Sequence, residues 1–153
     1  MFDIVGMGNA IVDLITPAAE NPAFLGMHNT NKGGFFHTRA DEFEEILHFS
    51  KSNRISAGGS VANSMKTFAA LGGKACFIGK IGMDKYGTFF TDSLKNYDIY
   101  SGLFIDKEEA TGCSVVLVHE DGEKSICAKR RASKIIPYKS INMELVSEAK
   151  GLF

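Results

Sequence analysis

Short apolar runs alternate with amphipathic stretches along most of the chain. Residues 2–5 are largely apolar and are closed by Gly6-Met7-Gly8, which predicts a buried strand ending in a tight turn. Similar runs predict strands over residues 54–56, 74–78 and 103–106. Apolar positions at helical spacing predict helices over residues 40–49, 60–71, 85–96 and 143–150. In the second of these helices Ser60 is the expected N-cap, and Gly72-Gly73 ends the helix.

Strands that alternate with helices predict a parallel sheet with crossover connections. Two parts of the chain break this rhythm. Residues 114–119 and 124–129 predict strands joined by the turn Glu120-Asp121-Gly122-Glu123, which is typical of a hairpin, and residues 33–38 resemble a short strand. We interpret residues 33–38 and 111–131 as a small β lid inserted in an α/β core. Residues 151–153 look like the opening of another strand.

Composition narrows the class of protein but not its chemistry. The chain has 153 residues, of which 44% are hydrophobic and 23% charged, and this is typical of a globular protein with a real core. A net charge of -1 gives no long-range attraction to nucleic acid or to an anionic membrane. No apolar run is long enough to span a bilayer, and no basic region precedes an apolar stretch at the start. Three widely spaced cysteines favour reduced thiols, so we expect a cytoplasmic protein.

Three glycine-rich segments are candidates for ligand binding. The first, Gly6-Met7-Gly8-Asn9-Ala10-Ile11, has two glycines of a dinucleotide fingerprint but Ile11 in place of the third, which favours a plain turn. The second, residues 58–64, opens a helix whose unpaired N–H groups and Asn63 could face a ligand, although ordinary helix capping explains it equally well. The third, residues 79–87, favours a loop with Asp84 as a helix cap.

Taken together, these segments resemble the PfkB (ribokinase-like) carbohydrate kinase family. The family pairs Gly-Gly-x-x-x-Asn with Leu-Gly and then Gly-x-Asp-x-x-Gly. The chain has Gly58-Gly59-Ser60-Val61-Ala62-Asn63, Leu71-Gly72 and Gly82-Met83-Asp84-Lys85-Tyr86-Gly87 in that order. Residues 6–13 and Ala110-Thr111-Gly112 also match. The resemblance covers nearly the whole chain. Within the family, the chain is similar to adenosine-kinase-like and broad-range bacterial members. It implies a doubly wound α/β fold with a mostly parallel sheet and a β lid.

The resemblance also implies a role for individual residues. Asp13 resembles the strand-end aspartate that hydrogen-bonds sugar hydroxyls, and Gly58, Gly59, Ser60 and Asn63 resemble the residues that hold the same sugar. Gly58-Gly59 resembles the hinge by which the lid closes. A carboxylate and an amide suit vicinal hydroxyls because together they supply paired acceptors and donors. The alternative for Asp13 is a surface acid beside a strand.

Two features depart from the family pattern. Lys129, Arg130 and Arg131 form a basic cluster where close relatives often have small or apolar residues; either a solvated turn or a changed contact with ligand explains it. The second departure is the absence of the family's Gly-Ala-Gly-Asp signature from these residues. The resemblance implies that this signature supplies the catalytic aspartate and is followed by the ATP site, which is absent as well. We therefore expect a chain truncated before the nucleotide-binding half, with no catalytic or metal-binding residue of its own.

The resulting prediction is the N-terminal, acceptor-binding part of a sugar or nucleoside kinase. The family transfers the γ-phosphoryl group of ATP, with Mg²⁺, to a primary hydroxyl; this chain alone is expected to be inactive and to bind neither cofactor. Its expected partners are a small-molecule acceptor and either a complementing C-terminal half or a second copy paired through the lid. The alternative is a non-catalytic binding or oligomerisation module, a gene remnant built on the lid.

Overall fold

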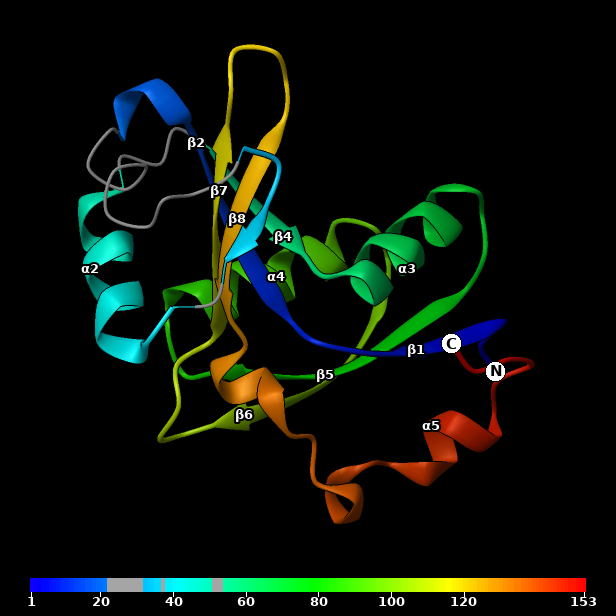
Figure 1. Ribbon diagram of the computed structural model, residues 1–153. Coiled ribbons are helices and arrows are strands. Elements are labelled where there is room, and N and C mark those ends of the chain that lie inside the picture. Colours follow the sequence, from blue (N-terminus) through cyan, green and yellow to red (C-terminus); the bar gives the residue numbers. More distant parts are fainter. Residues whose placement is uncertain (22–31, 37, 51–53) are drawn as a thin grey trace. The chain divides into compact units, whose positions relative to one another are not determined.

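The computed structural model describes residues 1–21, 32–36, 38–50 and 54–153, and these residues form two compact units (Figure 1). The first unit consists of residues 1–12, 57–112 and 130–153, and the second of residues 13–56 and 113–129. The chain therefore passes between the units several times, and each unit is assembled from segments far apart in sequence. His37, which the sequence places in a short strand, lies outside the described residues.

The first unit is built on a parallel sheet in the order β1-β5-β6. Its strands are β1 (Ile4–Met7), β5 (Ala75–Gly82) and β6 (Tyr100–Asp106). Its α-helices are α3 (Ser60–Ala70), α4 (Lys85–Lys95) and α5 (Met143–Ser147). Two short 3-10 helices, η2 (Arg131–Lys134) and η3 (Tyr138–Ser140), precede α5. Val5 pairs with Cys76, and Cys76 with Tyr100. Residues after α5 return beside β1, with Phe2 opposite Ala149 and Val5 opposite Leu152, so the two ends of the chain lie close together (Figure 1).

Both faces of this sheet are covered, as expected for parallel strands. On one face the buried side chains of Val5, Cys76 and Ile78 pack against the C-terminal segment, through residues that include Leu145 and Val146. Helices α3 and α4 contact β1, β5 and β6, and the rings of Phe77 and Phe90 lie 5.5 Å apart. Gly6 makes room for this packing, because a Cβ at that position would meet the Sδ of Met65 at 2.7 Å. The opening glycines therefore serve helix packing.

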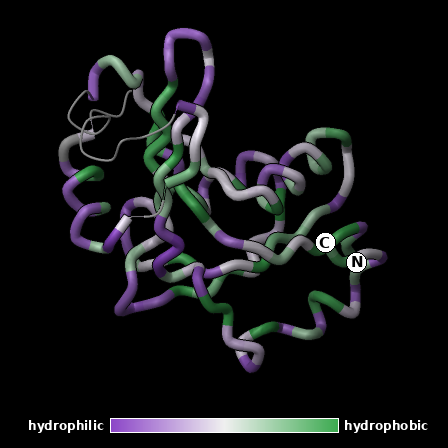
Figure 2. Tube along the Cα trace, viewed as in Figure 1, coloured by the Kyte–Doolittle hydropathy of each residue, from purple (hydrophilic) through white to green (hydrophobic). Residues whose placement is uncertain are grey.

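The second unit is built on a five-stranded sheet in the order β3-β8-β7-β2-β4. Its strands are β2 (Ile11–Pro17), β3 (Phe35–Phe36), β4 (Arg54–Gly58), β7 (Gly112–Val118) and β8 (Lys124–Lys129), and its helices are η1 (Ala18–Glu20) and α2 (Ala40–Phe49). Strands β7 and β8 are antiparallel, while β3 runs parallel to β8. Helix α2 contacts β8 and buries Phe43 and Ile46. Strands β2 and β7 are mostly hydrophobic, whereas the turn between β7 and β8 is hydrophilic (Figure 2).

Most expected elements are present, and the ends of several differ for identifiable reasons. Helix α2 and strand β8 have the predicted bounds, and residues 111–131 include a hairpin that lies outside the β1-β5-β6 sheet. Strand β5 does not stop at Ile78 but continues through Gly82, because β6 pairs with it as far as Asp106. Helix α5 ends at Ser147 rather than near residue 150, since Ala149 pairs with Phe2.

The start of α3 also differs from the prediction. Ser60 is the first residue of the helix and not its N-cap; the N-cap is Gly59, and no side chain caps this helix among the described residues. Gly58, expected in a turn, is the last residue of β4. None of the helices within the described residues is long and apolar enough to cross a membrane.

Candidate functional site

The segment with Gly58, Gly59, Ser60 and Asn63 is the junction between β4 and α3. A single residue, Gly59, separates the last residue of the strand from the first residue of the helix. Its φ of 93° lies in the left-handed region, and a Cβ there would collide with the backbone carbonyl oxygen of Asn9. Glycine is required on both counts, because other residues adopt this φ only with strain. The sharp junction therefore depends on Gly59 more than on Gly58.

The start of α3 presents polar groups to a ligand. Backbone N–H groups in the first turn of a helix have no carbonyl four residues earlier, and they carry the positive end of the helix dipole. The N–H of Asn63 already donates to the carbonyl of Gly59 at 2.9 Å. Ser60 and Asn63 in this turn are exposed, so their hydroxyl and amide groups are accessible to solvent. This arrangement can bind an oxygen-rich neutral or anionic group.

Asp13 lies in the second unit and inside a strand rather than at its end. It is the third residue of the seven-residue strand β2, and it is half-buried between the buried side chains of Val12 and Leu14. Its Oδ1 accepts a hydrogen bond of 2.5 Å from the hydroxyl of Ser114 on the neighbouring strand β7. The carboxylate is therefore held in place by its own sheet. The predicted strand-end position was wrong, because β2 extends as far as Pro17.

The predicted acceptor-binding residues belong to both units. Gly58, Gly59, Ser60 and Asn63 are gathered in the first unit, at one junction. Asp13 belongs to the second unit. The chain connects them directly, since Asn9, whose carbonyl lies against Gly59, precedes Asp13 by only four residues.

Asp84, predicted as a helix cap, does more than cap α4. Its Oδ1 accepts from the N–H of Gly87 at 2.8 Å and from the hydroxyl of Thr111 at 2.7 Å, and its Oδ2 accepts from the N–H of Thr111 at 2.8 Å. Burial alone would raise the pKa of this carboxyl, but the hydrogen bonds from Thr111 and Gly87 outweigh burial and lower it. Asp84 thus holds the buried Thr111, the residue just before β7 begins.

Glycine at position 82 belongs to the same contact. A Cβ on Gly82 would meet the carbonyl oxygen of Glu109 at 2.5 Å and the nitrogen of Thr111 at 2.6 Å. The N–H of Gly82 also donates to the Thr111 hydroxyl at 2.9 Å. Through these residues, the motif Gly82-x-Asp84-x-x-Gly87 contacts the backbone of the segment that enters β7. The sequence pattern by itself had indicated only a loop and a helix cap at this motif.

Sequence reasoning missed an ion pair at the ends of β5 and β6. The Lys80 Nζ lies 2.5 Å from Asp106 Oδ2, and the two side chains are 19% and 16% exposed. Asp106 also accepts from the backbone N–H groups of Glu109 and Glu108. The hydrogen bond from Lys80, followed by those backbone bonds, lowers the pKa of Asp106 to about 2. The available signal was Lys80 itself, a charged residue inside an otherwise apolar run.

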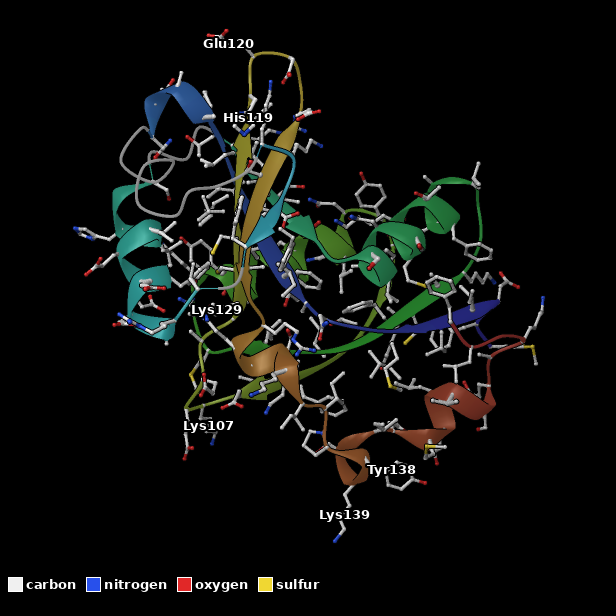
Figure 3. All side chains as sticks on the ribbon, viewed as in Figure 1. Lys107, His119, Glu120, Lys129, Tyr138 and Lys139 are labelled. Atoms are coloured by element: carbon white, nitrogen blue, oxygen red, sulfur yellow. The ribbon has the colours of Figure 1, made fainter. Side chains whose placement is uncertain are left out.

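The basic cluster is partly engaged in backbone contacts. Lys129 lies at the opposite end of β8 from the hairpin turn that carries His119 and Glu120 (Figure 3). Its Nζ donates to the carbonyl of Thr38. The Arg131 Nη1 lies 3.5 Å from the carbonyl oxygen of Thr111, while Arg130 is exposed. Arg131 has a φ of 44°, which is uncommon for a residue with a side chain. These contacts tie the cluster to the fold at two points.

In the described part of the chain, the predicted residues neither form a metal-binding cluster nor line the open hollow of the first unit. Within the part of the chain that the structure describes, no three His, Cys, Asp or Glu side chains gather so as to hold a metal ion. An open hollow of about 770 Å³ lies at the amino ends of β5 and β6, lined by residues that include Phe2, Gly73, Tyr97 and Tyr100. None of the five predicted residues lines this hollow.

Comparison with known proteins assigns the family. The family model described as "pfkB family carbohydrate kinase" matches residues 36–149, about three quarters of the chain. The chain belongs to the PfkB family. The match includes residues 58–63 and the 82–87 motif, while Asp13 precedes it. The family predicted from the motifs is thus confirmed.

Curated relatives within the family include plant fructokinases. The chain is 32% identical over 96 residues to "Probable fructokinase-2" of Arabidopsis thaliana, an alignment that covers 61% of this chain and 29% of that protein. It is 24% identical over 150 residues to "Fructokinase-2" of Oryza sativa subsp. japonica, covering 96% of this chain and 38% of that protein. The chain therefore spans about a third of the length of these relatives.

Solved structures of the family confirm the ribokinase-like α/β fold. An adenosine kinase from Sinorhizobium meliloti matches with a TM-score of 0.86 and 27% identity, covering 99% of this chain and 46% of that one. A probable sugar kinase from Rhizobium etli matches with a TM-score of 0.86 and 28% identity over the same shares of the two chains. The chain corresponds to slightly less than half of each of these structures.

Proposed function

We propose that this chain is the acceptor-binding part of a kinase that phosphorylates a primary hydroxyl of a sugar or nucleoside. The observation that supports it most strongly is the fold similarity over 99% of the chain to a protein described as an adenosine kinase and to one described as a probable sugar kinase. The fructokinase relatives support the same class of acceptor. All of these acceptors carry vicinal hydroxyl groups next to a primary alcohol.

The predicted residues have the chemistry that such an acceptor needs. The carboxylate of Asp13 accepts hydrogen bonds from neighbouring hydroxyls, and the amide of Asn63 both donates and accepts. The N–H groups at the start of α3 and the hydroxyl of Ser60 supply further donors and acceptors. A hydrogen bond to a charged group contributes about 1.5–3 kcal/mol, so Asp13 is the residue on which affinity depends most.

The second unit corresponds to the lid in this proposal. Its sheet includes the segments that the sequence assigned to a lid, residues 33–38 and 111–131, apart from the first and last few residues. Gly58-Gly59 closely follows the point at which the chain returns from the second unit to the first, between Ser56 and Ala57, and this supports the hinge that the resemblance implies. We assign the hinge to this position.

The described residues do not fit a complete site for ATP and Mg²⁺. No Gly-Ala-Gly-Asp segment occurs in the 153 residues, and no cluster of metal-binding side chains occurs in the described part of them. In this proposal the chain's own residues bind and orient the acceptor and exclude water around it. The phosphoryl donor and its metal are then bound by a complementing part of the family's fold. The other possible association is a pair of two copies of this chain, formed through the lid.

Isothermal titration with D-fructose, D-ribose and adenosine tests the binding step. We expect Asp13→Asn to weaken binding of the preferred compound by about 10- to 150-fold, because one charge-assisted contact is lost. Asn63→Ala should weaken it by about 5- to 10-fold. The matched control is Asp92→Asn, which removes an exposed acid on α4. Unchanged affinity in Asp13→Asn would refute the assignment of Asp13.

An ADP-release assay tests the catalytic part of the proposal. We expect the 153-residue chain to show no ATP-dependent turnover of any of the three compounds, since removal of a base or of an anion-stabilising group each lowers rates by hundreds- to thousands-fold. Turnover above the blank that Asp13→Ala abolishes would contradict this. Self-association without binding of any of the three compounds would instead favour a non-catalytic module.

A further inference from the structure

Ser114 occupies a position in β7 where a hydroxyl group is unusual. It is 2% exposed, and its neighbours Cys113 and Val115 are also buried. It is the only hydroxyl-bearing residue in β7, whose sequence is Gly-Cys-Ser-Val-Val-Leu-Val. Its partner across the sheet on β8 is Ala128.

The hydroxyl is costly at this position unless it is hydrogen-bonded. Burying a hydroxyl without a partner is unfavourable, whereas an apolar residue of similar size is tolerated. The partner of Ser114 is the Oδ1 of Asp13, 101 residues away in sequence and 2.5 Å away in space. That distance is in the range of an O–H group that donates to an ionised carboxylate, which is about twice as strong as a neutral hydrogen bond. The serine is thus explained by Asp13.

We infer that Ser114 is a positioning residue, which fixes the Asp13 carboxylate in the orientation that receives the acceptor hydroxyls. The inference rests on the proposed function of Asp13. A carboxylate on a strand rotates about two side-chain bonds, and a bond from a buried hydroxyl selects one arrangement of both. The bond also commits one known oxygen of the carboxylate to the protein. The acceptor then meets a carboxylate in a fixed plane.

The position of Ser114 is itself fixed by contacts along β7. Strand β7 pairs with β8 from Cys113 to Val118, so the backbone of Ser114 is held by the ladder on both sides of it in sequence. A hydroxyl on such a strand has little freedom to move. This is the support that a binding residue needs in order to be held within about 0.5 Å of its working position.

Nuclear magnetic resonance of the chain tests the positioning directly and needs no ligand. The three-bond couplings from the Asp13 Cγ to its backbone nitrogen and carbonyl carbon report its χ1 rotamer. We expect a single rotamer in the parent chain and in Ser114→Thr, and averaged couplings in Ser114→Ala. The matched control is Ser125→Ala, which removes another buried serine of the same sheet, one bonded to His119 at 2.8 Å. Unchanged Asp13 couplings in Ser114→Ala would overturn the inference.

Titration with whichever of D-fructose, D-ribose and adenosine binds best supplies the functional arm. Ser114→Ala should weaken binding about 3- to 10-fold, as expected for one side chain that must be ordered on binding. Ser114→Thr should bind normally, and Ser125→Ala should bind within twofold of the parent chain. Loosened couplings with unchanged affinity would overturn the role of Ser114 in binding. If Asp13→Asn leaves affinity unchanged, the proposed function of Asp13 fails, while the couplings still decide whether Ser114 fixes its rotamer.

Discussion

At the scale of single residues, two contacts join polar side chains that are far apart in the sequence. Ser114 and Asp13 come from different strands, and so do Lys80 and Asp106. The second pair is largely buried, and it also receives two backbone N–H groups from the loop after β6. Its contribution to stability depends on pH because one partner is a carboxylate.

The first prediction concerns this ion pair. The folded-state pKa of Asp106 is about 2, below the usual value of 3.8, so its stabilising effect is complete above pH 4 and is lost as the pH falls toward 2. In urea titrations, Asp106→Asn should be clearly less stable than the parent chain at pH 6. The difference should shrink steadily between pH 4 and pH 2.

The double variant Lys80→Gln/Asp106→Asn serves as the reference for this test. It removes both charges and leaves no buried lysine without its carboxylate, so it should be more stable than Asp106→Asn at pH 6. A difference between Asp106→Asn and the parent chain that stays constant from pH 6 to pH 2 would show that the carboxylate is not stabilised by the fold.

At the scale of elements, two helices end in the same way but with different residues. In α3 the N–H of Gly73 donates to the carbonyl of Phe68, and Gly72 has a φ of 91°. In α4 the N–H of Ile99 donates to the carbonyl of Leu94, and the corresponding left-handed residue is Asp98, with a φ of 54°. This helix ending favours glycine at the left-handed position.

The second prediction follows from that comparison. Asp98→Gly should raise the free energy of unfolding by about 0.5–1 kcal/mol, because it removes the strain of a side chain in the left-handed region. Gly72→Asp, the reciprocal change in α3, should lower it by a similar amount. Thermal and urea unfolding of both variants measures the effect. Destabilisation by Asp98→Gly would mean that the aspartate side chain stabilises the end of α4 in its own right.

The third prediction concerns the junction between β5, α4 and the start of β7. Asp84→Ala should destabilise the chain by about 2–4 kcal/mol, because it removes a helix cap and leaves the buried Thr111 hydroxyl without its main acceptor. Thr111→Val keeps the volume and removes only the hydroxyl, so it should cost about 1–2 kcal/mol. Equal effects of the two changes would contradict the capping role of Asp84.

At the scale of the whole molecule, two exposed apolar side chains lie at one edge of the first unit's sheet. The segment from Gly151 to Phe153 pairs with β1, and its residues Leu152 and Phe153 are 62% and 58% exposed. Within the described residues, no further strand covers the outer side of this segment. Open strand edges with apolar side chains favour association with another chain.

The fourth prediction is that this edge drives association. The parent chain should sediment as a concentration-dependent mixture in analytical ultracentrifugation, and Leu152→Lys/Phe153→Lys should shift it toward monomer, because charges at an edge oppose pairing. Tyr138→Lys changes another exposed residue, 76% exposed and outside any strand, and should have no such effect. A parent chain that stays monomeric at high concentration would rule out the edge as an interface.

The sequence by itself determined what short-range bonding encodes. The bounds of α2, the cap of α4 at Asp84 and the left-handed Gly72 that follows α3 all depend on contacts within a few residues, so local patterns predicted them. The order of the glycine motifs also identified the family, and at Gly59, Gly82 and Gly87 an added side chain would collide with the fold.

The tertiary structure alone decided the rest, because it depends on neighbours that are distant in sequence. Strand β5 extends to Gly82 only because β6 lies beside it, and Gly59, with Asn9 against it, replaces Ser60 as the N-cap of α3. Ser114 was invisible as a functional candidate until folding placed it against Asp13, 101 residues away. Sequence patterns record which residues need a partner, and only the packed sheets decide which partner each residue meets.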